Sequence, residues 1–314
     1  MEALKVCFVG VGSIAGRHIR NLRAVCDARG ISLQMDGYIW EGDRTDGLTC
    51  VYLAAEDVPN DYDAIFITNP TQVHLDSLKT FHGKGKHFFI EKPVVSLGQI
   101  GAAEAFRTRK DSVYYVAAPL RYNAVIQWIK NNVDPSDVIS VRSISSSYLP
   151  AWRPGRDYRE TYSAHKAMGG GVSIDLIHEW DYLTYLFGWP EKVFSLIGKK
   201  SGLEIDSDDY AVYIAEYADR IAELHLDYFG RKTIREIQLF TGDETIVGDI
   251  AGNRIRFLVK DEVIDFHEER DDYQKRELGY FLDMITGKIP AEDGFYHGIN
   301  ILGLTQGNCC DGFC

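Results

Sequence analysis

The stretch His87-Phe88-Phe89-Ile90-Glu91-Lys92-Pro93 decides how the first part of the chain folds. Its apolar run is typical of a buried strand, and Pro93 must end that strand because proline donates no hydrogen bond to a sheet. In an open parallel sheet, ligands bind where the carboxyl ends of the strands meet. We therefore expect Glu91 and Lys92 at the mouth of a binding cleft, although an ordinary surface pair at a strand end is the alternative.

A glycine turn follows the first strand of the chain. Leu4–Val9 is apolar, as expected of a buried parallel strand, and Gly10-Val-Gly-Ser-Ile-Ala-Gly16 and an amphipathic helix come after it. Strand, glycine turn and helix together form a dinucleotide-binding fingerprint: Gly10 permits the tight turn, and Gly12 lets a pyrophosphate approach the backbone. The helix would begin at Ser13 and Ile14, where its first amides attract a phosphate.

The acid that would select the cofactor follows the second strand. We expect this strand within Leu33–Trp40, so that Glu41 stands at its carboxyl end. An acid there accepts both ribose hydroxyls of NAD and repels the extra phosphate of NADP, so we favour NAD over NADP. Alternatives remain open, because Asp36 and Asp43 are rival acids and Arg44 could contact a phosphate.

A third strand, Tyr62–Thr68, ends in Asn69-Pro70-Thr71, and a helix carrying His74 follows. We expect this loop to face the same crevice as Gly12, with His74 as a structural residue of the cofactor site rather than a catalyst. Alternating strands and helices continue to about residue 118. They predict an α/β Rossmann domain with a doubly wound parallel sheet over residues 1–120.

The second half of the chain has a different organisation, which predicts an α+β domain over residues 121–290. Its strands alternate polar and apolar residues, which is typical of a large, mostly antiparallel open sheet with one wet or partner-covered face. A helix at Asp272–Thr286 would close this domain, and residues 291–314 would form a C-terminal helix and tail. We expect the strands at Val138–Tyr148, Val193–Ile197, Tyr210–Tyr217, Ile221–Tyr228, Ile234–Phe240, Arg254–Val259 and Val263–Phe266.

The candidate catalytic segment of this second domain begins with Gly169-Gly170-Gly171. The glycines would open a helix through about Leu186 and leave its first amides free for a ligand. Residues three apart on a helix are neighbours, so Asp175, His178 and Asp181 would share one face. A carboxylate beside an imidazole fixes its tautomer, as a proton-transfer residue requires; a capping histidine is the alternative.

The loop Tyr148–Lys166 is the most informative stretch about the substrate. It gathers cations and aromatic residues, which recognise phosphate or carboxylate groups and sugar or base rings, respectively. A solvated loop whose own acids cancel the charge is the alternative. The residues concerned are Trp152, Arg153, Arg156, Tyr158, Arg159, Tyr162 and Lys166, with Asp157 and Glu160 as the acids.

Composition excludes some partners. The net charge of −12 argues against nucleic acid and anionic membranes. No signal peptide is evident, and Cys7, Cys26 and Cys50 look like buried small hydrophobic residues of a reducing compartment, so we expect the cytoplasm. Cys309, Cys310 and Cys314 lack the spacing of a zinc site, and we expect no metal.

These motifs, taken in order along the chain, resemble the glucose–fructose oxidoreductase/inositol dehydrogenase/rhizopine-catabolism family of dehydrogenases. The likeness extends from residue 4 to about 290, and the Tyr148–Lys166 loop resembles members of bacterial surface-sugar and sialic-acid-like pathways. The family usually ends in an apolar helix that returns to the nucleotide domain, and here only Ile299–Leu304 fits. The motifs are the glycine fingerprint, Asn69-Pro70-Thr71-x-x-His74, Glu91-Lys92-Pro93, Arg121-Tyr122-Asn123 and Gly169-Gly170-Gly171.

The resemblance implies a set of site residues. The family's catalytic lysine, aspartate and histidine correspond to Lys92, Asp175 and His178; two residues separate the last two here instead of three, so Asp181 could share the role of Asp175. The implied cofactor set is Gly10, Gly12, Ser13, Ile14, Glu41, Asn69, Pro70, His74, Glu91, Lys92, Trp152 and Arg153. The implied substrate set is Arg121, Tyr122, Tyr158, Arg159, Tyr162, Lys166 and Asp181.

The resulting hypothesis is an NAD(H)-dependent oxidoreductase that transfers hydride between nicotinamide and a secondary alcohol of a sugar. The arginine-containing loop favours an anionic or nucleotide-linked sugar, and the second sheet favours a homodimer or homotetramer. Two alternatives stay open: a glycosidase that retains NAD, and a non-catalytic dinucleotide-binding regulator, since a fold does not fix a function. Retention of Lys92 with His178 argues against the regulator.

Overall fold

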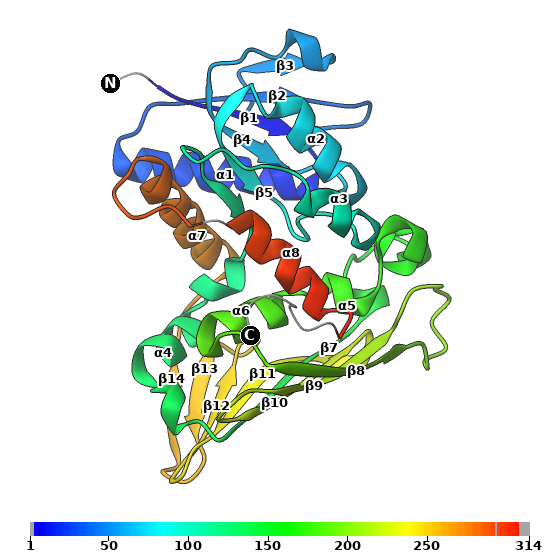
Figure 1. The fold of residues 1–314 in the computed structure, drawn as a ribbon, viewed down its shortest axis with the longest axis vertical. Coiled ribbons are helices and arrows are strands. Elements are labelled where there is room, and N and C mark those ends of the chain that lie inside the picture. Colours follow the sequence, from blue (N-terminus) through cyan, green and yellow to red (C-terminus); the bar gives the residue numbers. More distant parts are fainter. Residues whose placement is uncertain (1–2, 293, 308–314) are drawn as a thin grey trace. The chain divides into compact units, whose positions relative to one another are not determined.

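The computed structural model describes residues 3–292 and 294–307, which divide between two compact units (Figure 1). The first unit runs to Ala117 and also contains Arg270–Ile299. The second contains Ala118–Glu269 and the residues from Asn300 onward. In the described ranges, no helix is both long and apolar enough to cross a membrane.

The first unit is the expected doubly wound parallel sheet. Its strand order is β3-β2-β1-β4-β5-β6, and every neighbouring pair is parallel. The strands β2 and β3 lie on one side of β1, whereas β4, β5 and β6 follow on its other side. Such folds bind ligands where the strand order reverses in this way, here between β1 and β4. The strands are β1 (Leu4–Val9), β2 (Leu33–Tyr38), β3 (Cys50–Tyr52), β4 (Tyr62–Ile67), β5 (Gly85–Ile90) and β6 (Tyr114–Val116); the helices include α1 (Ser13–Arg29), α2 (His74–Phe81) and α3 (Ile100–Glu104).

Helix α7 (Arg270–Ile285), which we expected in the second domain, is grouped with the first unit. It lies along α1, where Arg29 forms an ion pair with Asp283 at 2.8 Å. Its Phe281 ring meets the stacked rings of Phe66 and Phe89 edge-on, so it completes the core beneath β4 and β5. The apolar face of this helix was predictable, but the sheet that it covers was not.

Two details of the first sheet differ from our expectations. The short edge strand β3 was not predicted, because three residues carry too little periodicity to be recognised. Cys50 lies on this strand and is exposed, so the expectation that it is buried was wrong. Cys7 and Cys26 are buried as expected, and burial raises the pKa of their thiols to about 12 and about 11. The three cysteines from 309 to 314 lie outside the described residues.

The second unit is built on the expected large sheet, with strand order β14-β13-β12-β11-β7-β10-β9-β8. Only β7 and β10 pair in parallel; all other neighbours are antiparallel. The strand β12 was missed. The strands are β7 (Ser140–Tyr148), β8 (Lys192–Gly198), β9 (Tyr210–Glu216), β10 (Ile221–Asp227), β11 (Phe229–Phe240), β12 (Thr245–Asp249), β13 (Arg254–Phe257) and β14 (Glu262–Asp265).

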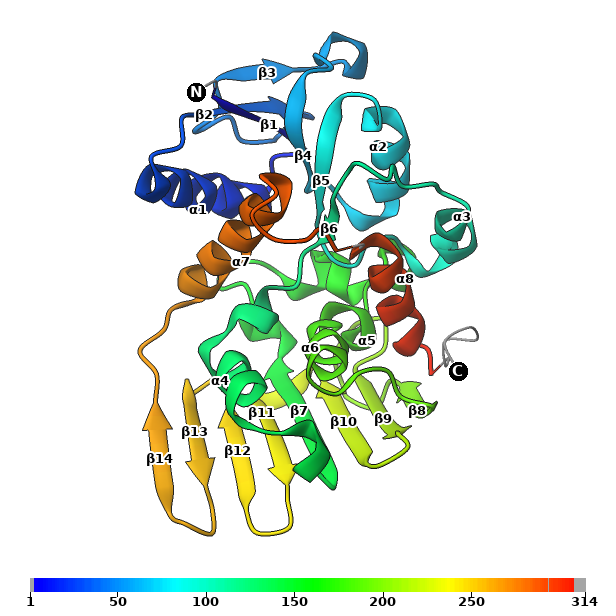
Figure 2. The same cartoon turned by 60° about the vertical axis from the view of Figure 1, so that its left-hand side comes forward.

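Within the described residues, helices cover one face of this sheet and leave the other open. Figure 2 shows α4 (Ala124–Asn132), α5 (Val172–Asp175) and α6 (His178–Phe187) on the same face. Leu224 and Leu226 of β10 point to that covered face and are buried, whereas Phe194 and Leu196 of β8 are 61% and 63% exposed. The alternation predicted from the sequence therefore separates a helix-packed face from an open one.

Candidate active site

The glycine turn of the first unit has the conformation that the fingerprint requires. Gly10 has φ +80°, and a Cβ there would lie 2.6 Å from Cβ of Asn69, so only glycine fits. A Cβ on Gly12 would meet no atom within 4 Å, which leaves the backbone accessible. Helix α1 begins at Ser13 with no side-chain cap and no acid in its first turn. Its amino end can therefore receive an anionic group.

The residues after β2 divide into structural and accessible groups. The Asp36 carboxylate is buried and accepts hydrogen bonds from Tyr62 (2.7 Å) and the Cys50 amide (3.1 Å), so it serves the sheet. Asp43 accepts the amides of Val11 (2.9 Å) and Trp40 (3.1 Å), and so fixes the turn against the glycine loop. Glu41 lies in that turn and is exposed, as is Arg44. The rival acids thus have structural roles, which leaves Glu41 as the accessible carboxylate.

His74 connects the loops that follow β4 and β5. Its Nε2 lies 2.9 Å from the Asn69 carbonyl, and its Nδ1 lies 3.1 Å from the Pro93 carbonyl. The ring is fully buried, and burial lowers the pKa of His74. This geometry agrees with a structural role and not with a catalytic one. Pro70, between these contacts, is exposed.

A buried acid–histidine pair lies beside Lys92 and was not predicted from the sequence. Oε1 of Glu91 is 2.6 Å from Nε2 of His18, which projects from α1. Oε2 of Glu91 accepts the amide of Lys92 at 3.2 Å, and the Lys92 side chain is half-buried. His18 lies on the buried face of α1 with Ala15 and Ile19, so helical periodicity could have revealed it.

The first unit fits a dinucleotide. Beside the open glycine turn, Oδ1 of Asn69 is buried without a hydrogen-bond partner among the described residues, while its amide donates to Ser77 (2.6 Å). A buried polar atom of this kind usually indicates a missing partner. Gly10, Gly12, Asn69 and Lys92 all lie at the carboxyl edge of one parallel sheet, as a nucleotide would require.

In the second unit, the expected single helix is two. Helix α5 ends at Asp175 and α6 begins at His178, with a break at Leu176, whose φ and ψ are −97° and 28°. The argument that Asp175 and His178 share one helical face was therefore wrong. Oδ2 of Asp175 instead accepts the hydroxyl of Tyr228 at 2.5 Å, and Tyr162 also donates to this carboxylate. Burial, with the charge of Asp175, raises the pKa of both phenols well above the usual value.

The triple glycine has a different purpose from the one that we expected. A Cβ on Gly171 would lie 2.1 Å from Oδ1 of Asp208, and one on Gly170 would lie 2.1 Å from the Tyr162 carbonyl. The Asp208 carboxylate accepts the Ser173 amide at 2.9 Å. The expectation that the first amides of this helix are free for a ligand was wrong, because Asp208 binds them.

His178 is the half-buried first residue of α6, and its neighbour Glu179 anchors the helix. The Glu179 carboxylate is fully buried and lies 2.6 Å from Nε of Arg235 on β11. One turn along α6, Asp181 forms a two-bonded ion pair with Arg121 at 2.7 and 2.9 Å. Two predicted substrate residues thus neutralise each other. Tyr122, beside Arg121, is half-buried.

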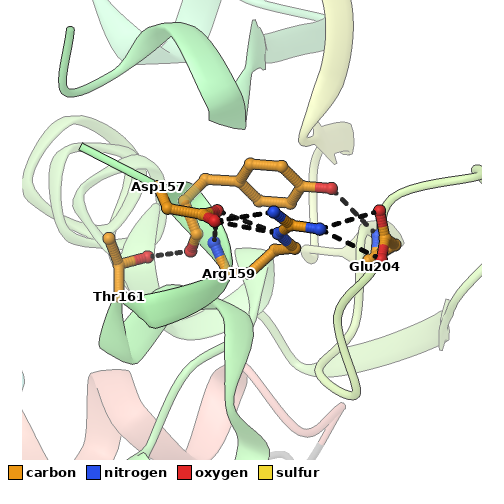
Figure 3. A network of polar contacts seen from close by, with 5 residues as sticks. Asp157, Arg159, Thr161 and Glu204 are labelled. Atoms are coloured by element: carbon orange, nitrogen blue, oxygen red, sulfur yellow. Dashed lines mark hydrogen bonds and ion pairs between the residues drawn. The ribbon is translucent and has the colours of Figure 1, made fainter. Parts of the chain in front are cut away.

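The cationic loop is divided into paired and unpaired charges. Figure 3 shows Arg159 between the carboxylates of Asp157 (2.7 Å) and Glu204 (3.3 Å), which agrees with the alternative of a self-neutralised loop for this arginine. Tyr158 accepts the Glu204 amide at 3.1 Å. In the described part of the chain, no carboxylate forms an ion pair with Arg153, Arg156 or Lys166. The loop therefore keeps a positive surface of three cations.

Two aromatic contacts join this loop to the Asp175 group. The Trp152 indole donates to Ser147 at 2.9 Å and meets the Tyr228 ring edge-on at 5.2 Å. The Arg153 guanidinium lies 5.6 Å from the centre of the Tyr162 ring. Tyr228, which the sequence did not single out, thus links the loop to Asp175.

Comparison with known families agrees with this geometry. Residues 4–117 match the family described as "Oxidoreductase family, NAD-binding Rossmann fold", and residues 127–241 match the "GFO/IDH/MocA C-terminal domain". This chain belongs to the GFO/IDH/MocA family of oxidoreductases. The resemblance drawn from the motifs is thereby confirmed, as is the fold.

Relatives of this GFO/IDH/MocA protein include a named dehydrogenase and an uncharacterized oxidoreductase. It is 20% identical to a myo-inositol 2-dehydrogenase of Thermotoga maritima, over 93% of this chain and 91% of that one. It is 26% identical to an uncharacterized oxidoreductase, YrbE, of Bacillus subtilis over 57% of this chain, and spans about half (52%) of YrbE.

Solved structures with similar folds include a UDP-N-acetylglucosamine 3-dehydrogenase from Acidithiobacillus ferrooxidans (TM-score 0.78, 20% identity, 98% of this chain and 96% of that one). A levoglucosan dehydrogenase in complex with NADH has a TM-score of 0.82 at 13% identity, with the same coverage. At these identities, the likeness establishes the fold alone.

Proposed function

We propose that this protein is an NAD(H)-dependent dehydrogenase that acts on a secondary alcohol of a sugar. The observation that supports it best is Lys92, half-buried at the end of β5 beside the carboxylate of Glu91. A mere nucleotide sensor has no need of a lysine held in this way at the carboxyl edge of the sheet. Bound nicotinamide would exchange a hydride with the alcohol carbon.

Each candidate catalytic residue has a distinct task. The Lys92 ammonium would polarise the oxygen that becomes a carbonyl. His178 would take the hydroxyl proton, alone or with Lys92. In the second unit, Asp175, which accepts the hydroxyl of Tyr228, would supply a fixed negative charge, and Asp181 is paired with Arg121.

The substrate that we propose is an anionic or nucleotide-linked sugar. The support comes from Arg156 and Lys166, which form no ion pair among the described residues, because arginine forks onto phosphate or carboxylate groups and lysine attracts them. Tyr158 and Tyr162 add rings against which a sugar can stack. The similar proteins named as dehydrogenases of myo-inositol, UDP-N-acetylglucosamine and levoglucosan agree with a sugar or polyol substrate.

The cofactor that we propose is NAD rather than NADP. Glu41 is the exposed acid of the turn after β2, whereas Asp36 and Asp43 are engaged with the backbone and Tyr62. Glu41→Gln should weaken NAD binding by about tenfold, as expected for loss of charge-assisted hydrogen bonds, and improve NADP binding. Isothermal calorimetry with both cofactors measures this; an unchanged ratio of affinities would assign selectivity elsewhere.

We also propose that copies of the chain associate through the open face of the second sheet, and that the protein acts in the cytoplasm. Phe194, Leu196 and Ile214 form an exposed apolar group on neighbouring strands of that face. Leu196→Glu should lower the oligomeric state measured by analytical ultracentrifugation. A monomeric wild-type protein would contradict the association.

The experiment that tests the main proposal is a screen for reduced nicotinamide by absorbance. NAD and NADP are each offered with inositols, uronic acids, amino sugars and nucleotide-linked sugars. Turnover of an anionic or nucleotide-linked sugar with NAD is the expected result. Binding of NAD without turnover of any sugar would favour the regulator, and tightly retained NAD with cleavage of a glycoside would favour the glycosidase.

A further inference from the structure

His18 and Glu91 form a hydrogen-bonded pair that is largely shielded from solvent. The His18 side chain is 1% exposed, and that of Glu91 is 13% exposed. Their atoms Nε2 and Oε1 are 2.6 Å apart. The rings of Phe66 and Phe89 pack against the imidazole, with centres 6.1 and 5.0 Å from it.

The charge of Glu91 depends on this contact. Burial by itself raises the pKa of Glu91, but the hydrogen bond and charge of His18, together with the charge of Lys92, hold it below its usual value. An ionised carboxylate only accepts hydrogen bonds, so Nε2 of His18 carries the donated proton. Nδ1 of His18 is buried and has no hydrogen-bond partner among the described residues, so the contact with Glu91 is the hydrogen bond that orients the ring between Phe66 and Phe89.

Glu91 transmits this contact to Lys92. Its second oxygen, Oε2, accepts the Lys92 amide, so one carboxylate bridges α1 and the residue that carries the ammonium. The charged and titratable groups that face Glu91 are His18 on α1, Lys92 in its own loop, and His74 on α2, whose pKa the Glu91 charge raises against the larger effect of burial.

We propose that His18 is a positioning residue for Lys92: through Glu91, it keeps a negative charge beside the ammonium and fixes the loop that carries it. This inference rests on the proposed function only in naming Lys92 as catalytic. The contact from His18 to Glu91 and on to the Lys92 backbone exists regardless of the reaction.

The first test needs no turnover. Competitive acetylation of lysines, read by mass spectrometry across pH, gives the pH at which Lys92 is half-labelled, with exposed Lys86 as the internal control. Without its donor, buried Glu91 takes up a proton more readily, and Lys92 then holds its own proton less firmly. His18→Leu and Glu91→Gln should both move half-labelling of Lys92 to lower pH.

His18→Gln is the matched variant, because its side-chain amide can still donate to Glu91. It should keep the labelling of Lys92 close to that of the wild type. A normal labelling curve in His18→Leu would overturn the proposal, as would an equal shift of Lys86, which would indicate a general loosening of the unit.

The second test separates this inference from the proposed function. With a sugar that the enzyme oxidises, His18→Leu should lower kcat by about tenfold, as expected for a misplaced catalytic group, with little change in Kd for NAD. The pH profile of kcat should move to lower pH, and His18→Gln should restore both. If the wild type oxidises no sugar, the proposed function fails and the labelling alone decides the role of His18. If kcat of His18→Leu is normal, the function stands and the inference fails.

Discussion

The two compact units present their candidate residues by different means. In the first unit they follow the ends of parallel strands, as Asn69 follows β4 and Lys92 follows β5. In the second they lie on loops and short helices, where side-chain pairs such as Asp175 with Tyr228 hold them. Backbone geometry thus positions the first set, whereas side-chain chemistry positions much of the second.

The largest expected effect is a loss of catalytic rate without a loss of stability. Lys92→Ala and His178→Ala should each lower kcat by about a hundredfold or more, because each removes a proposed proton-transfer or polarising group. Neither should change the midpoint of urea unfolding by much, since both side chains are only half-buried. Steady-state rates by nicotinamide absorbance measure the first effect.

The matched control for this comparison is Lys86→Ala, an exposed lysine at the other end of β5. It should leave kcat unchanged. If either candidate variant retained wild-type kcat on an identified sugar, that residue would not be catalytic, and the corresponding unit would contribute binding alone.

Glycine substitutions should reveal where the backbone itself is under constraint. Gly10→Ala places a Cβ 2.6 Å from Asn69 at φ +80°, and should destabilise the protein by about 2–4 kcal/mol. Gly12→Ala meets no atom within 4 Å, so it should leave stability unchanged and weaken dinucleotide binding only. Urea unfolding and calorimetry with NAD measure the two effects. Equal stability losses would contradict this division of roles.

A matched pair of glycine substitutions makes the same test in the second unit. Gly171→Ala brings a Cβ to 2.1 Å from the Asp208 carboxylate at φ +133°, and should destabilise the protein by a similar amount of about 2–4 kcal/mol. Gly202→Ala meets no atom within 4 Å and is the control. A neutral Gly171→Ala would mean that Asp208 moves aside without cost, and that the side-chain network is less constrained than its contacts indicate.

The same contrast explains what the sequence could predict. Strand ends and the glycine turn were predictable because periodicity and proline or glycine positions encode backbone geometry locally. The break between Asp175 and His178 was not, because the residues that bond to this segment, Asp208 and Tyr228, are distant in sequence. Helical periodicity could have predicted that His18 is buried, but not its partner, because Glu91 is 73 residues away. Contacts between distant residues leave no local signal.

A smaller effect tests the side-chain network directly. Tyr228→Phe removes the hydroxyl that donates to Asp175 at 2.5 Å, and leaves a buried carboxylate with one donor fewer. We expect a loss of about 2 kcal/mol in the free energy of unfolding, typical of hydrogen bonds to charged groups. Tyr217→Phe is the matched control, because the Tyr217 hydroxyl is buried without a partner in the described ranges. Equal effects of the two variants would contradict the proposed support of Asp175.

The smallest effect concerns the pH dependence of stability, compared for one partly buried acid from each unit, Glu91 and Asp208. The pKa of Glu91 is lowered: burial raises it, but the hydrogen bond and charge of His18 and the charge of Lys92 outweigh burial. Its contribution to stability is therefore present above the ordinary value of 4.5 and is lost as pH falls through the folded-state value. Burial and the charge of Asp175 raise the pKa of Asp208, so its contribution is present below the ordinary value of 3.8 and is lost as pH rises through the folded-state value.

The two isosteric variants should therefore respond to pH with opposite signs. Relative to Glu91→Gln, the wild type should gain about 1 kcal/mol of unfolding free energy as pH rises from about 3 to about 6, the size of a typical buried hydrogen bond. Relative to Asp208→Asn, it should lose stability over the same range. Urea unfolding at several pH values measures both differences, and taking each difference against the wild type cancels the carboxylates that the proteins share. Stability differences that change with pH in the same direction would mean that Glu91 and Asp208 have similar surroundings. The contrast between Glu91, which pairs with a histidine at a strand end, and Asp208, which lies in a loop near the charge of Asp175, would then not hold.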